Sequence, residues 1–298
     1  MLSAKPWTWD AIIRLLLGAF ICLCLGSIVV SCLHYSGPSG PRYWVFLALA
    51  GVGFVLLVLS LIIIGRQWPT DDLFLRPLII LLACLSGGLS FAAWAQKMAG
   101  LPDEGNSGEQ MVAAEAAVLI FFIGFLRARR VKWSEAFGIC NNRRYAILGG
   151  IAVACIFLPV AEGLQWGSYH LMTNLRIEPQ EQEAVRALRI TNAWTNRLVL
   201  GSLALFLAPV VEELFFRGML YPAIKQAGFP RLAIWGVSLL FALVHFNLVS
   251  FVPLFVLAIL LTLLYEHTDN LLAPITAHAL FNALNFGMLY LFEKQMAR

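Results

Sequence analysis

Six polar residues interrupt the apolar carboxy-terminal third of the sequence at spacings that could support chemistry. Carboxylates, imidazoles and carboxamides can activate water, hold an oxyanion or bind a metal ion. An ionisable side chain within a lipid-embedded helix costs on the order of a few kcal/mol, so such residues usually face the interior of a helical bundle and mark function. In chain order the six residues are Glu212, Glu213, Arg217, His245, His278 and Asn282.

The first group combines two adjacent glutamates with an arginine near the end of an apolar run. Glu213 and Arg217 are four residues apart, so on a helix they share a face and can form an ion pair. Glu212 projects about 100° away around the helix and is left to face another partner. The alternative is a helix end that reaches water and carries its ion pair on the surface.

His245 lies across a turn from Glu212. Residues 228–230, with the sequence Gly-Phe-Pro, mark the turn, and Glu212 and His245 are almost equally far from its middle along the chain. If both helices run regularly from the turn, the carboxylate and the imidazole lie at the same membrane depth, as the activation of water requires. Taken alone, a histidine on an apolar helix is more often a hydrogen-bonded core residue.

His278 and Asn282 are also four residues apart, which places both side chains on one helix face. Two polar groups aimed the same way can hold an oxyanion or bind a metal ion. The alternative is hydrogen bonding between helices, which membrane proteins also use. The depth argument for Glu212 and His245 does not extend to His278.

The composition indicates that lipid surrounds most of the chain. Of its 298 residues, 60% are hydrophobic and only 13% are charged, whereas soluble domains carry about 25% charged residues. The net charge is +4, and no basic stripe interleaved with aromatic residues is present, so nucleic-acid binding is not expected. None of the six cysteines belongs to a CxxC pair, which argues against a disulfide framework or a zinc knuckle.

Apolar runs long enough to cross a bilayer recur along the sequence and predict an all-α, polytopic transmembrane bundle of eight or nine spans. The first run is longer than a signal-peptide core and is interpreted as a retained helix. The runs lie near residues 11–33, 43–65, 75–95, 111–127, 146–165, 198–218, 231–249, 251–267 and 272–292.

The predicted spans divide the chain into three parts. Residues 1–165 form amino-terminal transmembrane helices of unassigned role, residues 166–197 a polar or interfacial connector, and residues 198–298 a catalytic helical core. The densest basic stretch runs from Arg127 to Arg144. By the positive-inside rule this stretch and the amino terminus are cytoplasmic, which predicts a multi-pass protein of the cell (inner) membrane.

The motifs EExxxR, FxxxH and HxxxN, in this order in an apolar chain, resemble the CPBP family. This family comprises the CAAX proteases and bacteriocin-processing enzymes, also called ABI-domain proteins. The resemblance covers roughly residues 180–292 and does not extend to the first five spans. It rests on Glu212, Glu213, Arg217, Phe241, His245, His278 and Asn282, with Ala208-Pro209 and Gly218 as flanks.

The resemblance implies a membrane-embedded peptidase that hydrolyses a peptide bond in a membrane-associated or lipidated protein or peptide. In such an enzyme Glu212, assisted by His245, activates water. His278 and Asn282 steady the tetrahedral oxyanion, while Glu213 and Arg217 give structural support.

The sequence leaves the question of a metal open. Glu212, His245 and His278 also form a plausible zinc triad with an open position. The chain has no HExxH motif, and a glutamate cannot readily be both ligand and base. The expectation is therefore a metal-free glutamate mechanism without a certain cofactor, with zinc as the alternative.

Two functions of other classes are alternatives to a protease. A non-enzymatic relative could bind a membrane peptide as a scaffold or immunity protein, although the full set of matching residues argues against lost activity. In a proton-coupled transporter, buried glutamate and histidine would relay protons. The sequence lacks the paired, Gly/Pro-broken repeats that such a transporter would have.

Overall fold

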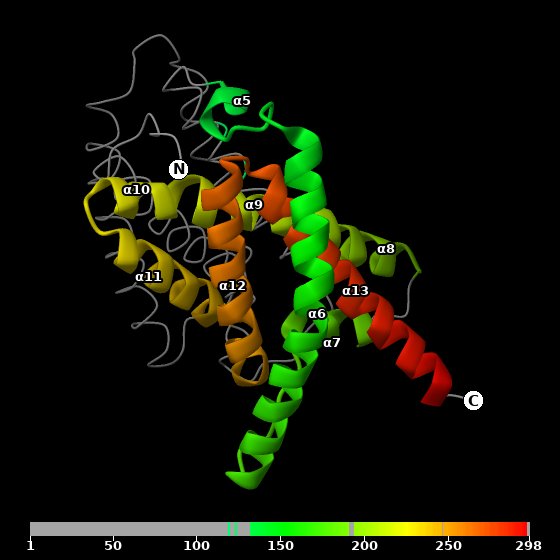
Figure 1. The fold of residues 1–298 in the computed structure, drawn as a ribbon. Helices are drawn as coiled ribbons and strands as arrows, with labels where there is room; N and C mark the ends of the chain where they lie inside the picture. Colours follow the sequence, from blue (N-terminus) through cyan, green and yellow to red (C-terminus); the bar gives the residue numbers. More distant parts are fainter. Residues whose placement is uncertain (1–118, 120–122, 124–131, 191–193, 246, 297–298) are drawn as a thin grey trace, which may run out of the picture. The chain divides into compact units, whose positions relative to one another are not determined.

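The computed structural model describes residues 119, 123, 132–190, 194–245 and 247–296, so the spans predicted before residue 128 lie outside the described residues. In the part that is described every regular element is helical, which confirms the all-α class there (Figure 1). The elements are α5 (Trp133–Ala136), α6 (Arg143–Asn174), α7 (Glu183–Ile190), α8 (Trp194–Ser202), the π-helical turn η2 (Leu203–Leu207), α9 (Ala208–Glu213), the π-helical turn η3 (Leu214–Leu220), α10 (Tyr221–Gln226), α11 (Pro230–Leu243), α12 (Leu248–Thr268) and α13 (Leu272–Met296).

Several of these helices are long and apolar enough to cross a membrane, which makes the chain an integral, multi-pass membrane protein. Among the described residues three helices meet both criteria: Arg143–Asn174, Arg197–Gln226 and Leu248–Thr268. At a rise of about 1.5 Å per residue, the 32 residues of α6 cover about 48 Å, more than the hydrocarbon core of roughly 30 Å. One or both ends of α6 therefore extend beyond that core.

The helix α11 is shorter than the span predicted over residues 231–249. It has 14 residues, or about 21 Å of helix, which is too short to cross the bilayer alone. The reason is the cap of α12, where Oδ1 of Asn247 accepts a hydrogen bond of 2.9 Å from the backbone N–H of Ser250. As a result His245 lies just beyond the end of α11 rather than within the helix.

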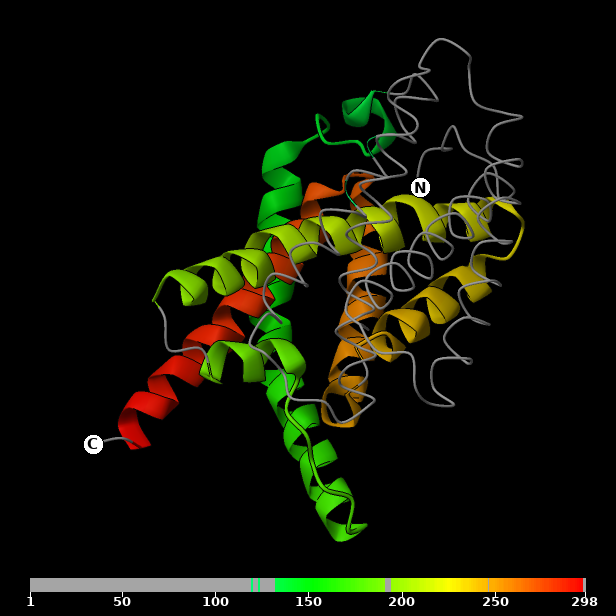
Figure 2. The same ribbon diagram turned by 180° about the vertical axis from the view of Figure 1, so that it is seen from behind.

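Small residues bring α6 and α13 close together, and the two helices lie side by side in both views of the ribbon (Figures 1 and 2). On α6 the buried residues Ala146, Gly150 and Ala154 recur every fourth position. They face α13, where Ala273 and Ala277 are fully buried. In lipid, where the hydrophobic effect does not join helices, such close backbone packing stabilises the bundle.

The helix that carries Glu212 is continuous from α8 to α10 but contains two wider turns. The π turns η2 and η3 each end two residues before a proline, Pro209 and Pro222 respectively. A proline within a helix lacks an N–H and its ring clashes with the carbonyl four residues earlier, and a π turn relieves both conflicts. The N–H of Ala208 accordingly bonds to the carbonyl of Leu203, five residues back.

The segment before α6 packs on the turn between α12 and α13. The N–H of Leu271 donates to the carbonyl of Phe137 at 2.9 Å. Gly138 has a φ of 64°, and a Cβ there would lie 1.9 Å from the carbonyl oxygen of Asp269, so only glycine fits. Phe137 also rests against Gly218, whose added Cβ would be 2.8 Å from its ring. This segment thus covers the helix next to Arg217.

Candidate active site

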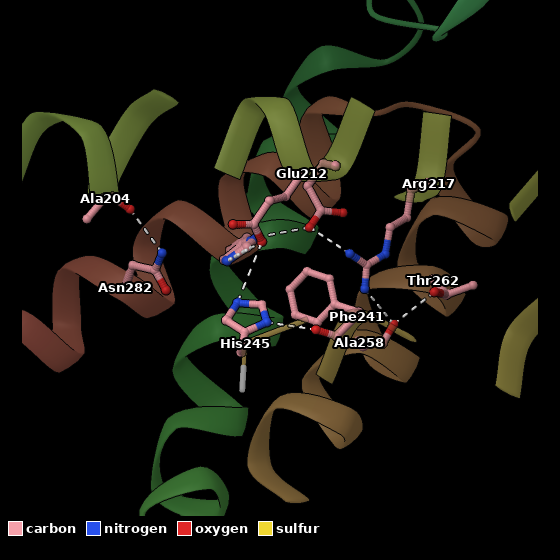
Figure 3. Close-up of polar contacts among 10 residues, drawn as sticks. Ala204, Glu212, Arg217, Phe241, His245, Ala258, Thr262 and Asn282 are labelled. Carbon is pink, nitrogen blue, oxygen red and sulfur yellow. Dashed lines mark hydrogen bonds and ion pairs between the residues drawn. The ribbon is translucent and has the colours of Figure 1, made fainter. Parts of the chain in front are cut away.

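Glu212 on α9, His245 just beyond the end of α11 and His278 on α13 come together at one point. Oε2 of Glu212 lies 3.9 Å from Nε2 of His245 and 4.0 Å from Nε2 of His278. Figure 3 shows the carboxylate of Glu212 directed toward the ring of His245. The same oxygen is buried and has no hydrogen-bond partner. Separations of about 4 Å are too long for direct hydrogen bonds but suit groups that share one bridging water.

The hydrogen bonds on the far side of each ring determine which nitrogen faces Glu212 as an acceptor. Nδ1 of His245 lies 2.7 Å from the carbonyl oxygen of Phe241. Because a carbonyl oxygen only accepts hydrogen bonds, Nδ1 carries the hydrogen. In the neutral ring Nε2 then has a free lone pair and is an acceptor. Nδ1 of His278 lies 2.9 Å from Oε1 of Glu213, and the same reasoning applies while Glu213 is ionised.

When both rings are neutral, three hydrogen-bond acceptors therefore face one another: Oε2 of Glu212 and the Nε2 atoms of His245 and His278. A single water has two hydrogens and cannot satisfy the three. The charges indicate how the third acceptor could obtain a donor. Glu212 and Glu213 carry two negative charges, and Arg217 carries one positive charge. A proton added to one of the imidazoles would make this cluster neutral and supply the missing donor.

The ion pair predicted between Glu213 and Arg217 is confirmed. Nη1 of Arg217 lies 2.9 Å from Oε1 of Glu213, and both side chains are 0% exposed. Nη2 donates to the carbonyl of Ala258 at 2.9 Å, which also accepts from Thr262 at 2.8 Å (Figure 3). A buried charge requires such partners, because its desolvation costs several kcal/mol. The pair thus binds the helix of Glu212 to α12.

Phe241 lies between this ion pair and the imidazoles. It is fully buried, and its ring centroid is 4.6 Å from Cζ of Arg217. The same ring is 4.8 Å from the ring of His245 and 5.6 Å from that of His278. Its face provides a cation–π contact for the guanidinium.

Asn282 is held at a different point from His278, although both lie on α13. Its Nδ2 donates to the carbonyl oxygen of Ala204 at 3.0 Å, a contact visible in Figure 3. A carboxamide carries two N–H groups, so one remains for another acceptor. Its neighbour Asn285 bonds instead to the carbonyl of Phe281 in its own helix.

Sequence reasoning missed the contacts that depend on how helices cross. The bond from His278 to Glu213 and the carbonyl of Ala258 as a partner of Arg217 leave no local spacing signal. A further network joins α10 to the end of α12, where Glu266 accepts from the hydroxyl of Tyr221 at 2.6 Å and pairs with Lys225.

The three side chains Glu212, His245 and His278 lie farther apart than the ligands of a zinc ion. Zn–N bonds of about 2.0–2.1 Å in a tetrahedral site place ligand atoms roughly 3.3–3.4 Å apart. The distances of 3.9 and 4.0 Å from Glu212 to the two imidazoles exceed that value. Among the described side chains, no three His, Cys, Asp or Glu residues are grouped so that they could hold a metal ion. The present spacing therefore fits a water better than zinc, and the zinc alternative stays a prediction.

The fold and the site define a helical membrane protein in which the carboxylate of Glu212 faces two imidazoles, one of them buried and the other partly exposed. Residues 193–284 match the model of the family described as type II CAAX prenyl endopeptidase Rce1-like. The match includes all seven residues on which the CPBP resemblance rests, and it confirms the resemblance.

A segment of 77 residues is 37% identical to a protein of Bacillus subtilis (strain 168) described as "Uncharacterized protein YpbD". The similarity covers 24% of this chain and 36% of YpbD, so the chain matches little more than a third of that relative's length. No solved structure matches the chain.

Proposed function

We propose that this protein is an intramembrane endopeptidase of the CAAX-protease type. It would hydrolyse a peptide bond in a membrane-associated or lipidated protein or peptide. The observation that carries the proposal is the buried, unpartnered Oε2 of Glu212, 3.9 and 4.0 Å from two imidazole nitrogens. The family of residues 193–284 supports the same reaction class.

In the proposed reaction Glu212 is the general base. A water bound between Glu212 and His245 donates one hydrogen to each, and its oxygen attacks the carbonyl carbon of the substrate. Glu212 accepts the proton as the C–O bond forms, and His245 orients the water through its Nε2 lone pair. The bond from Nδ1 of His245 to the carbonyl of Phe241 holds the ring in the tautomer that this role needs.

His278 and Asn282 would stabilise the oxyanion of the tetrahedral intermediate. With its Nδ1 bonded to Oε1 of Glu213, His278 would present Nε2–H as a donor when both ring nitrogens carry a hydrogen. The second N–H of Asn282 is the other donor. Fixed donors in a water-poor site stabilise developing negative charge strongly. Collapse of the intermediate breaks the C–N bond, and the proton held by Glu212 passes to the leaving amine.

The remaining features of the proposal concern the membrane. Because Glu212 lies in a helix long enough to span a bilayer, cleavage would occur within or near the membrane. We propose that the chain crosses the cell (inner) membrane eight or nine times and that its amino terminus is cytoplasmic. Residues 1–165 would form amino-terminal transmembrane helices of unassigned role, residues 166–197 a polar or interfacial connector, and residues 198–298 the catalytic core.

The test uses the full-length protein in liposomes with a fluorogenic peptide ending in a farnesylated CAAX sequence, and the same peptide without the lipid. Wild-type protein should cleave the farnesylated peptide. Glu212→Gln should lower kcat by about 10²–10⁴-fold at unchanged thermal stability. Glu162→Gln is the control, because this carboxylate is exposed on α6, and it should retain full activity.

Other outcomes identify the rival functions. A peptide-binding protein would retain the labelled peptide but release no product in any variant. A transporter would move protons across the liposome membrane without cleavage. Either result would overturn the proposal.

A further inference from the structure

The structure connects Pro209 to Asn282 through one backbone carbonyl. Pro209 is buried in the first turn of α9, three residues before Glu212. Asn282 lies on α13, four residues after His278. Asn282 contacts the same continuous helix through the hydrogen bond of 3.0 Å from its Nδ2 to the carbonyl of Ala204, in the π turn η2.

Pro209 removes the helical donors that this carbonyl would otherwise have. In a regular α-helix the carbonyl of Ala204 accepts from the N–H of Ala208, four residues on. Here the N–H of Ala208 bonds to Leu203 instead. In a π turn the donor would be residue 209, five residues on, but a proline has no N–H.

A carbonyl in this position needs a partner. Ala204 is 8% exposed, and an unpaired backbone carbonyl buried within a membrane protein is strongly unfavourable. Nδ2 of Asn282 donates to the carbonyl of Ala204 and so supplies the missing hydrogen bond. The bond uses one N–H of the amide and fixes the direction of the other.

We propose that Pro209 is a positioning residue, which acts by leaving the carbonyl of Ala204 open as an anchor for Asn282. The functional part of this inference rests on the proposed peptidase activity, because the anchored amide is there an oxyanion donor. Pro209 would then set the distance between α13, with His278 and Asn282, and the helix of Glu212. An alanine at position 209 would restore a backbone N–H that competes with the amide for the carbonyl.

The first measurement is a double-mutant cycle on peptide cleavage with Pro209→Ala, Asn282→Ala and the double variant, all in full-length protein. Pro209→Ala should lower kcat by about 10²-fold, as small misplacements of reacting groups do, with little change in KM. Because both residues act through one bond, the double variant should be no slower than Asn282→Ala. Multiplying effects on kcat, or an unchanged kcat in Pro209→Ala, would overturn the inference.

The second measurement is the same cycle on Tm, which does not depend on catalysis. Asn282→Ala should lower Tm when residue 209 is proline, because the carbonyl loses its donor. It should lower Tm much less when residue 209 is alanine or serine, because the new N–H replaces the amide. Equal losses of Tm in both backgrounds, or no loss with proline present, would refute the coupling. If the chain has no peptidase activity, the proposed function is wrong, but the cycle on Tm still tests the coupling between Pro209 and Asn282.

Pro159→Ala is the matched control. Pro159 also lies inside a helix, on an exposed position of α6. Its replacement should leave kcat unchanged and should not alter the effect of Asn282→Ala on Tm. A similar coupling at Pro159 would mean that the effect at Pro209 is a general consequence of removing a helix proline.

Discussion

His278 donates from Nδ1 to Oε1 of Glu213 across 2.9 Å and so joins α13 to α9. The same carboxylate oxygen accepts from Nη1 of Arg217, also at 2.9 Å. One buried carboxylate therefore orients an imidazole that faces Glu212 and balances a guanidinium on its own helix. Because of this shared oxygen, substitutions that appear purely structural should also change the electrostatics of the site.

Replacement of Arg217 tests the buried part of this cluster. Arg217→Met keeps the length of the side chain but leaves Glu213 without its counter-ion at a site where both side chains are 0% exposed. The expected loss is about 3–5 kcal/mol of unfolding free energy, measured by thermal or SDS-induced unfolding in detergent. Adding Glu213→Gln removes the uncompensated charge, so the double variant should be more stable than Arg217→Met. A double variant of equal or lower stability would contradict the buried-charge explanation.

A second ion pair provides a contrast between buried and accessible charges. The side chains of Lys225 and Glu266 are 28% and 26% exposed, so water screens their attraction. Lys225→Met should cost less than about 1 kcal/mol in the same unfolding assay. A loss as large as that of Arg217→Met would show that accessibility does not separate the two pairs.

Interactions fixed by local helix geometry were predictable from the sequence. The pairing of Glu213 with Arg217 follows from a spacing of four residues on any helix. The expectation that Glu212 and His245 lie at one depth used only their nearly equal distances along the chain from the turn at 228–230. The structure places Oε2 of Glu212 3.9 Å from Nε2 of His245, although His245 lies past the end of its helix.

Interactions that depend on how distant helices cross were not predictable. The bond from His278 to Glu213 spans 65 positions, and that from Asn282 to Ala204 spans 78. The early end of α11 was also missed, because the apolar pattern continues to Val244 while the side-chain cap at Asn247 decides where the next helix begins.

The proposed metal-free mechanism predicts a specific response to chelators and to zinc. Dialysis against a strong chelator should leave kcat for peptide cleavage unchanged, because a carboxylate base needs no resident ion. Added zinc should not raise kcat either, because the distances of 3.9 and 4.0 Å from Glu212 to the two imidazoles exceed the spacing of ligand atoms around zinc.

The zinc alternative predicts the reverse. Chelation would then abolish cleavage, and one equivalent of zinc would restore it. Elemental analysis of the purified protein gives an independent measurement, because a resident ion would be present at about one per chain. Loss on chelation with recovery on zinc would contradict the metal-free mechanism while leaving the peptidase assignment intact.

The close packing of α6 on α13 should be as important for catalysis as the polar contacts. A Cβ at Gly150 would lie 2.6 Å from the carbonyl oxygen of Ala273 and 3.1 Å from the backbone nitrogen of Ala277. Both atoms belong to backbone and cannot rotate away. Gly150→Ala should therefore push α13 outward and cost about 1–3 kcal/mol of unfolding free energy, measured by thermal unfolding.

The displacement of α13 should also lower activity, because that helix carries His278. We expect kcat to fall by roughly 10²-fold, as a shift of about 1 Å in a positioned group can produce. Gly163→Ala is the control on the same helix, since a Cβ there meets nothing within 4 Å. It should raise stability by about 0.5–1 kcal/mol, the usual gain of alanine over glycine in a helix, without affecting kcat. Equal behaviour of the two variants would mean that the close approach at Gly150 does not position α13.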